Sequence, residues 1–373
     1  MTWNASEPYN ELPKLPPRAE METREVLKAA IEARAALASL NQAAVSIPNP
    51  TVLINSIPIL EAQASSEIEN IVTTTDELFR YAQDEAGASD PATREALRYR
   101  TALYEGFLSV MTRPLSVVLA QKICSIIKMH DMDVRRNPGT YIGNPITKEA
   151  IYTPPVGEAV IRDKLSNWEE FVHSDDDVDP LVKMAVAHYQ FEAIHPFEDG
   201  NGRTGRVLNV LILVDAQLLT QPILYLSRYI ILNKSAYYTL LQDVTANGSW
   251  TPWILFMLEG IRQTAIFTIQ KISAIRELQN QFHEQIREVI KGGVNADLLA
   301  ILFEQPYCRI ANVIERCGVS RPTATGWLNA LSDAGILLNM KRGRERLFVN
   351  TRFLDLLGRD EEITETVPAP TLF

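Results

Sequence analysis

HPFEDGNGRTGR, residues 195–206, is the stretch that decides how this chain folds. It separates two segments, 180–194 and 203–218, whose apolar residues recur at helical spacing. Gly200 and Gly202 let the backbone of the turn adopt positive φ and leave its amides unobstructed. Because those amides stand where the second helix begins, their N–H groups and the helix dipole together predict an anion site.

Charged and ionisable side chains add chemistry to this turn. Arg203 and Arg206 lie three residues apart, so they share one helix face and can both point toward a bound polyphosphate. Asp199 suits Mg²⁺, which favours a carboxylate combined with phosphate oxygens. His195 can accept a proton from an attacking hydroxyl near neutral pH. A turn that merely joins two helices would explain the glycines but not this convergence, so we interpret the stretch as a nucleotide-phosphate site with a base beside it.

The stretch resembles the signature of the Fic family, H-P-F-x-(D/E)-G-N-G-R-x-x-R, and every specified position is present. The resemblance implies a mainly α fold, with a Fic-type helical core and a β-hairpin flap. It also implies a protein adenylyltransferase, which uses ATP and Mg²⁺ to transfer AMP to a Ser, Thr or Tyr hydroxyl of a target protein or of itself. The kinase branch of the family carries Lys where this chain has Gly202, so kinase activity is disfavoured. Phosphocholine transfer, which uses the same motif, remains an alternative.

The resemblance also assigns roles within the loop. His195 would be the catalytic base, and Asp199 would hold Mg²⁺ between the α- and β-phosphates. Arg203 would pair with the β-phosphate region and Arg206 with the γ-phosphate. The ATP-binding residues expected in the loop are Glu198, Asp199, Gly200, Asn201, Gly202, Arg203 and Arg206.

A second motif lies upstream of the loop. SSEIEN, residues 65–70, resembles the inhibitory motif of regulated Fic proteins, (S/T)-x-x-x-E-(G/N), with Ser65, Glu69 and Asn70 in the specified places. We expect a helix to follow Ser65, because serine hydroxyls suit an N-cap, although an ordinary capping pattern would look similar. The resemblance implies that Glu69 pairs with Arg206 and prevents productive binding of ATP. In some relatives this glutamate positions a hydrolytic water, so removal of AMP is left open.

Two further segments resemble parts of a Fic active site. Short β-prone runs within 140–155 predict a hairpin that holds the target by strand addition, with Ile142 and Tyr152 near the target; a purely structural hairpin fits the sequence equally. Downstream, Tyr237 and Tyr238 are expected to contact the adenine of ATP, although tyrosine pairs on helices are often core residues. Asn247 or Thr245 would be the amide or hydroxyl that completes this pocket.

The C-terminal part predicts a winged helix-turn-helix domain. Helices are expected at 297–304 and 310–317 and from Ser320 to Ala334, followed by two strands around a basic turn. That turn carries Lys341, Arg342, Arg344 and Arg346. The alternative function is therefore a DNA-binding regulator with a vestigial or nucleotide-sensing core. The complete catalytic motif argues against this alternative, and we favour a protein-interaction role for the domain.

The sequence predicts four parts: an N-terminal helical region at 1–90 with the inhibitory motif, a Fic catalytic core at 91–255, a linker helix at 256–292 and the winged-helix domain at 293–373. A net charge of -10 gives no overall field that attracts nucleic acid. Three cysteines without metal-ligand spacing, the absence of a recognisable signal peptide and interrupted apolar runs favour a cytoplasmic protein without a membrane partner. Apolar helices expected to be exposed favour a homodimer.

Overall fold

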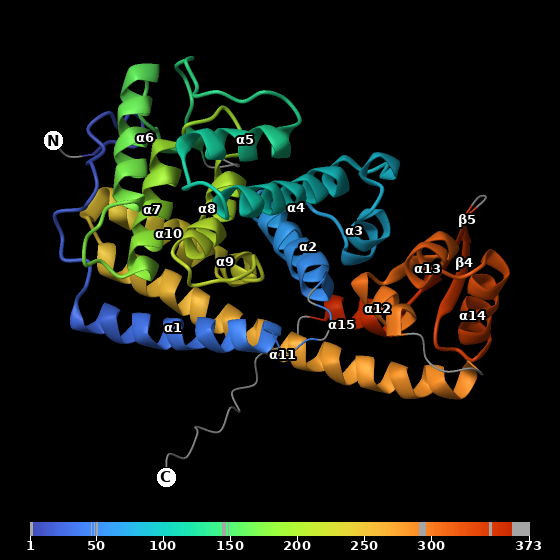
Figure 1. Cartoon of the computed structure of the whole chain (residues 1–373). Helices are drawn as coiled ribbons and strands as arrows, with labels where there is room; N and C mark the ends of the chain where they lie inside the picture. The colour runs from blue at the N-terminus through green and yellow to red at the C-terminus, as the bar shows by residue number, and fades with distance from the viewer. Residues whose placement is uncertain are drawn as a thin grey trace, which may run out of the picture. The chain divides into compact units, whose positions relative to one another are not determined.

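The computed structural model describes residues 3–45, 47, 49, 51–143, 147, 149–290, 296–342 and 345–359. The chain forms two compact units, Met1–Ile272 and Ser273–Phe373. The described residues confirm a mainly helical fold with a small hairpin and a second, winged-helix unit (Figure 1). The finer division at residues 90, 255 and 292 stays a prediction, and 291–295, where the last boundary was expected, lie outside the described residues.

The first unit contains most of the helices. Its elements are α1 (Arg24–Val45), α2 (Thr51–Ile68), α3 (Thr75–Tyr81), the short 3-10 helix η1 (Glu85–Gly87), α4 (Pro91–Val110), α5 (Val117–Lys128), β1 (Ile142–Gly143), β2 (Ala150–Tyr152), α6 (Glu158–Val172), α7 (Pro180–Ile194), α8 (Asn201–Asp215), α9 (Leu226–Leu232), α10 (Lys234–Asn247) and the greater part of α11 (Trp250–Val289).

Helices α7 and α8 form the centre of the first unit (Figure 1). Both are buried on nearly every face, as expected of helices that are apolar all round. Trp168 on α6 and Trp253 on α11 each donate an indole N–H to a carbonyl of α7, at 2.9 and 2.8 Å. Asp179 caps the start of α7 by accepting from the Leu181 amide at 2.8 Å, so the chain enters this helix at a defined position. The loop at 195–200 is thereby held between two fixed helices.

Helix α2 corrects one expectation from the sequence. Ser65 and Ser66 lie near the end of this helix and are fully buried, whereas an N-cap that begins a new helix was expected there. The helix begins instead at Thr51, whose amide donates to Asn49 Oδ1 at 3.1 Å. It ends at Ile68, and Asn70 then adopts a left-handed conformation with φ of 61°. Burial of the apolar residues from Val52 onward, which form one continuous helical segment, decides the boundary over the local capping preference of serine.

The predicted hairpin is present and short. Ile142 pairs with Tyr152 and Gly143 with Ala150 in antiparallel register, while residues 144–146 and 148 lie outside the described part of the chain. The N-terminal arm runs beside it, because the Tyr9 amide donates to the Thr153 carbonyl at 3.0 Å. Lys164 on α6 then fixes the arm by donating to the Leu12 carbonyl at 2.7 Å.

The second unit has the winged-helix order of elements. They are α12 (Ala296–Glu304), β3 (Tyr307–Arg309), α13 (Ile310–Cys317), α14 (Arg321–Asp333), β4 (Leu338–Arg342), β5 (Glu345–Val349) and α15 (Thr351–Gly358). The sheet has three strands in the order β3-β5-β4, not the two expected, because the short run before α13 pairs with β5. Ser320 caps α14 as predicted. Within the described residues, no helix combines the length and the apolar character needed to cross a membrane.

Candidate active site

His195 is held at the end of α7 by main-chain contacts. It adopts the left-handed conformation, with φ of 50°, and its amide donates to the Phe191 carbonyl at 3.0 Å. Arg135, which is buried, donates through Nε to the His195 carbonyl at 2.7 Å, and its amide donates to the Pro196 carbonyl at 2.9 Å. The same guanidinium also bonds to the Pro155 carbonyl just after the hairpin. Arg135 therefore fixes the conformation that presents His195.

The His195 imidazole is neutral at ordinary pH. Burial, and then the nearby positive charge of Arg135, lowers its pKa to about 4. A neutral ring has a free acceptor nitrogen, which a general base requires.

The glycine loop ends in an open helix N-terminus. The Asn201 side chain closes the loop on itself: it accepts from the Phe197 amide and donates to the Phe197 carbonyl, each at 2.8 Å. Gly200, with φ of 83°, is the N-cap of α8 and supplies no side-chain cap. The first amides of α8 are therefore available to an anion. A cavity of about 390 Å³ lies at this point and is lined by the following residues: Glu69, Ile71, Glu95, Lys128, His195, Glu198, Asp199, Gly200, Asn201, Gly202 and Arg203.

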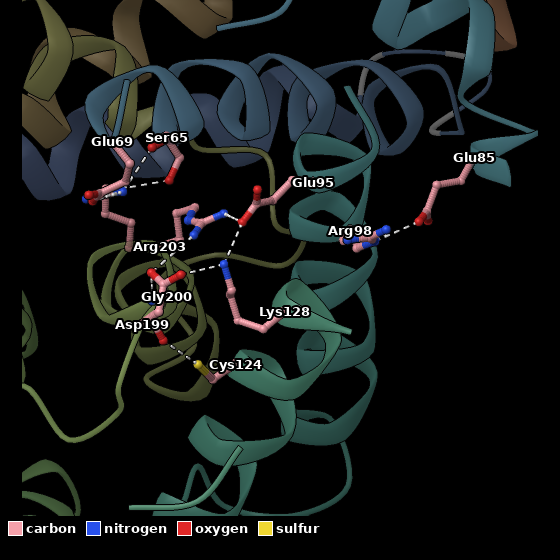
Figure 2. Close-up of polar contacts among 11 residues, drawn as sticks. Ser65, Glu69, Glu85, Glu95, Arg98, Cys124, Lys128, Asp199, Gly200 and Arg203 are labelled. Atoms are coloured by element: carbon pink, nitrogen blue, oxygen red, sulfur yellow. Dashed lines mark hydrogen bonds and ion pairs between the residues drawn. The ribbon is translucent and has the colours of Figure 1, made fainter. Parts of the chain in front are cut away.

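Arg206 is buried and engaged by α2. Its Nη2 donates to Glu69 Oε1 at 2.8 Å and to the Ser65 carbonyl at 2.9 Å, and its Nε donates to Ser65 Oγ at 2.8 Å. Burial raises the pKa of Glu69, but the charge of Arg206 outweighs burial and holds that pKa below its usual value. The pair is therefore ionised at neutral pH, and Figure 2 shows Glu69 and Ser65 on the same side of the site.

Glu69 lies directly over the start of α8. A Cβ atom added to Gly202 would come within 2.3 Å of Glu69 Oε1 and 2.9 Å of Arg206 Nη1. The carboxylate thus occupies the space that the helix N-terminus offers to an anion. Asn70, which follows, needs the left-handed conformation that only glycine and asparagine adopt readily, and this explains the last position of the upstream motif.

A second charged network lies across the cavity (Figure 2). Arg203 donates to Glu95 Oε1 at 2.5 Å, and Lys128 Nζ lies 3.0 Å from the same oxygen. Lys128 Nζ also lies 2.5 Å from Asp199 Oδ2. Neither Glu95 on α4 nor Lys128 at the end of α5 was identified from the sequence. Glu95 lies 108 positions from Arg203 and Lys128 lies 71 positions from Asp199, and neither belongs to a local pattern. Only the packing of α4 and α5 on α8 brings them to the loop.

A larger, mostly apolar cavity of about 660 Å³ adjoins the end of α2, the hairpin and α10. The two tyrosines that were predicted to contact the adenine lie differently with respect to this cavity. Tyr238 lines it and is 43% exposed, whereas Tyr237 is 1% exposed and donates to or accepts from His188 Nε2 at 2.9 Å inside the core. The structure therefore does not bring Tyr237 to this cavity, because its ring packs among core residues; a contact of Tyr237 with the adenine stays an untested prediction. Thr245 lines the cavity, but Asn247 bonds instead to Asp243 on an exposed face.

Ile142 and Tyr152, the two residues predicted to lie near the target, differ in how far their side chains are engaged by the rest of the protein. Ile142 is partly exposed and lines the larger cavity. Tyr152 lines it too, but its hydroxyl donates to the Ala193 carbonyl at 2.7 Å and its ring stacks against Trp3. Tyr152 therefore connects the hairpin to α7 and the N-terminal arm, and Ile142 is the freer of the two side chains. Glu198 is exposed, and its Oε1 accepts a hydrogen bond from Asn137 Nδ2 at 3.4 Å.

Comparison with known protein families gives three matches in order along the chain. Residues 27–108 match the Fic/DOC family N-terminal model, residues 121–213 match the Fic/DOC family model, and residues 278–353 match the C-terminal domain of SoFic-like protein adenylyltransferases. The fold is similar to a solved Fic family protein from Desulfovibrio desulfuricans, with a TM-score of 0.51 and 18% identity over 89% of this chain and 98% of that one. Fic-1 from Caenorhabditis elegans has a TM-score of 0.51 and 17% identity, over 67% of this chain and 74% of that one.

The fold and the loop together define a Fic-fold protein. With the three family matches, the chain belongs to the Fic/DOC family. Among curated relatives, it is 36% identical over 62 residues to protein adenylyltransferase fic-1 of Caenorhabditis elegans, covering 16% of this chain and 12% of the relative. It is 27% identical over 159 residues to protein adenylyltransferase Fic of Drosophila virilis, covering 40% of this chain and 30% of the relative. The matched regions thus span less than a third of these relatives.

Proposed function

We propose that this chain is a protein adenylyltransferase, which transfers AMP from ATP to a Ser, Thr or Tyr hydroxyl of a target protein and which Glu69 holds inactive. The observation that carries the proposal is the placement of a neutral His195 beside an open helix N-terminus whose anion position Glu69 occupies. The relatives named protein adenylyltransferase support the same activity.

The reaction needs one proton transfer and one displacement. His195 accepts the proton of the target hydroxyl while that oxygen forms a bond to the α-phosphorus of ATP. The bond from this phosphorus to the bridging oxygen breaks, and pyrophosphate leaves with the electron pair. The amides of Gly202 and the following turn of α8, with Arg203, stabilise the negative charge on the phosphate oxygens.

Asp199 fits a divalent cation. Its side chain is 63% exposed at the cavity, and its carboxylate already pairs with a cation, the Lys128 ammonium. Mg²⁺ bound there would neutralise charge on the phosphate oxygens, and the remaining ligands would be nucleotide and water oxygens. The adenosine part fits the larger cavity, where Tyr238 offers a ring for stacking and Ile142 an apolar contact.

Inhibition follows from competition for Arg206. A γ-phosphate needs this guanidinium, but Glu69 and Ser65 occupy it and the Glu69 carboxylate repels a neighbouring anion. Glu69 must move before ATP binds productively. Once moved, it can orient a water molecule, so removal of AMP by the same site is part of the proposal, as is modification of the chain itself. We also propose that the winged-helix unit docks protein partners.

Transfer of label from ATP tests the proposal. Three proteins are each incubated with a protein mixture and with ATP labelled at either the α- or the γ-phosphate. They are the wild-type chain, the Glu69→Gly variant, and the double variant that carries His195→Ala together with Glu69→Gly. We expect protein label from the α-position only, more in Glu69→Gly and none when His195 is absent. Label from the γ-position would identify a kinase, and no label from either position would contradict the proposal.

A further inference from the structure

Lys128 is a charged residue of the cavity that lies outside both sequence motifs. It ends α5, next to Met129 in the left-handed conformation, and its side chain is 18% exposed. Its ammonium lies 3.0 Å from Glu95 Oε1 and 2.5 Å from Asp199 Oδ2, and Lys128 lines the same cavity as His195. In Figure 2 it extends from α5 toward Asp199 and Glu95.

The cations of the site are paired with carboxylates when no ligand is bound. Lys128 and Arg203 pair with Glu95, Lys128 also pairs with Asp199, and Arg206 pairs with Glu69. Glu198 is a further carboxylate that lines the cavity. A polyphosphate with a divalent cation changes these pairs in two places. The cation competes with Lys128 for Asp199, and the phosphates need the positive charge that is released.

Lys128 is better suited than Arg203 to change partners. Arg203 is 2% exposed and is held by Glu95, so its guanidinium is fixed. A lysine ammonium is a compact charge on a flexible stem, with three donors in all directions. The contacts made by the described residues use two of these donors, one to each carboxylate, and leave a third for a ligand.

We propose that Lys128 is a phosphate-binding cation of this site: it pairs with Asp199 when the site is empty, contacts a bound polyphosphate through its remaining donor, and turns fully to the polyphosphate when a divalent cation takes Asp199. Glu95 is then a positioning residue that keeps Lys128 and Arg203 beside the loop. The inference rests on the proposed function, because it names the part of the nucleotide that becomes pyrophosphate as the ligand of Lys128.

Binding of inorganic pyrophosphate and of Mn²⁺, each alone, tests this assignment without any turnover. The full chain carries Glu69→Gly throughout, so that Arg206 is available, and calorimetry and electron paramagnetic resonance of Mn²⁺ report the two affinities. We expect Lys128→Met to weaken metal-free pyrophosphate binding by about tenfold, the typical effect of losing one charge-assisted hydrogen bond. Mn²⁺ alone should bind several-fold more tightly, because Asp199 loses its competitor. Lys128→Arg should restore most of the pyrophosphate affinity.

The matched control is Lys122→Met on the same helix. Lys122 pairs with Glu105 at 3.2 Å on an exposed face, so both affinities should stay unchanged. A merely structural role for Lys128 predicts that both affinities fall together with thermal stability. That result, or unchanged pyrophosphate binding, would overturn the assignment. Failure of AMP transfer while pyrophosphate binding shows the expected pattern would instead contradict the proposed function and leave the role of Lys128 in place.

Discussion

Ser65 and Arg206 lie 141 positions apart in the sequence and are joined by two hydrogen bonds, Nε to Oγ at 2.8 Å and Nη2 to the main-chain carbonyl at 2.9 Å. Glu69 adds the ion pair one helical turn later. The guanidinium is therefore held by a helix end and not by one carboxylate alone. This explains why a serine or threonine precedes the glutamate by four residues in the upstream motif: both side chains must reach the same arginine from one helix face.

Removal of the Ser65 hydroxyl should release Arg206 only in part. Ser65→Ala loses the Nε contact but keeps the carbonyl contact and the Glu69 pair, so we expect AMP transfer to rise about two- to fivefold, the effect of one neutral hydrogen bond. Initial rates of label incorporation measure this. The control is Ser66→Ala, which removes a buried hydroxyl that has no hydrogen-bond partner among the described residues. Equal rates in Ser65→Ala and the wild type would show that Glu69 alone holds Arg206.

The pH dependence of transfer should reflect the low pKa of His195. The ring acts as a base only when neutral, so activity falls as the pH drops through its pKa. Burial and the Arg135 charge lower that pKa to about 4. We expect kcat/KM of the Glu69→Gly chain to stay flat from about pH 8 to about pH 6, whereas a histidine with an ordinary pKa near 6.5 would lose most of its base form over this range. A half-maximal rate near pH 6.5 would show that the site does not depress the pKa of His195.

The two tyrosines of α10 should respond in opposite ways to substitution. Tyr238→Ala removes a ring from the larger cavity, so we expect the KM for ATP to rise about three- to tenfold with little change in stability. Tyr237→Phe removes only the hydroxyl that bonds to His188 and should cost about 1 kcal/mol of unfolding free energy without changing the KM. Steady-state kinetics and urea unfolding of both variants separate the effects. A raised KM in Tyr237→Phe alone would contradict the placement of the nucleotide.

Glu61 should make the stability of the chain depend on pH. It is fully buried on α2, where it accepts from the Ser227 amide at 2.9 Å and from the Tyr99 hydroxyl at 3.1 Å. Burial raises its pKa to about 7, against the lowering effect of these hydrogen bonds. The folded state therefore binds a proton more tightly than the unfolded state, so this contribution to stability is complete below the ordinary glutamate pKa and is lost as the pH rises through about 7.

Glu61→Gln tests the direction of this pH dependence of stability. The amide stays neutral, so the variant should be about 1–3 kcal/mol more stable than the wild type at pH 8, with the difference shrinking toward pH 5. Urea unfolding at both pH values gives the comparison. A wild-type chain that gains stability relative to Glu61→Gln as the pH rises would show the opposite linkage.

The sequence predicted the parts of the site that follow one another along the chain. Residues 195–206 combine a turn, a helix start and the catalytic side chains within twelve positions, so their order along the chain already places His195 near the anion site. The helix pattern of the core was also predictable, because α7 and α8 follow apolar periodicity. The expectation of a new helix after Ser65 was wrong, since a capping preference is worth less than the burial of a continuous apolar segment.

Residues that reach the site from distant helices had no sequence signal. Glu95 and Lys128 are ordinary charged residues of amphipathic helices, and only the packing of α4 and α5 against α8 gives them a role. Arg135 is likewise defined by the carbonyls that it contacts. Tyr237 and Tyr238 are adjacent in sequence, yet they point into the core and the cavity respectively, because consecutive helical residues lie about 100° apart.

The central claim is that the site is competent and that the Glu69–Arg206 pair holds it inactive. Its most direct test is the initial rate of AMP incorporation from α-labelled ATP in Glu69→Gly relative to the wild type. The control is Glu67→Gly, because Glu67 is an exposed acidic residue of α2. This substitution also removes a negative charge and adds a glycine. We expect a rise of about tenfold or more in Glu69→Gly, the effect expected when a charge-assisted pair no longer competes with the γ-phosphate, and no comparable rise in Glu67→Gly. Equal rates in Glu69→Gly and the wild type would contradict the account.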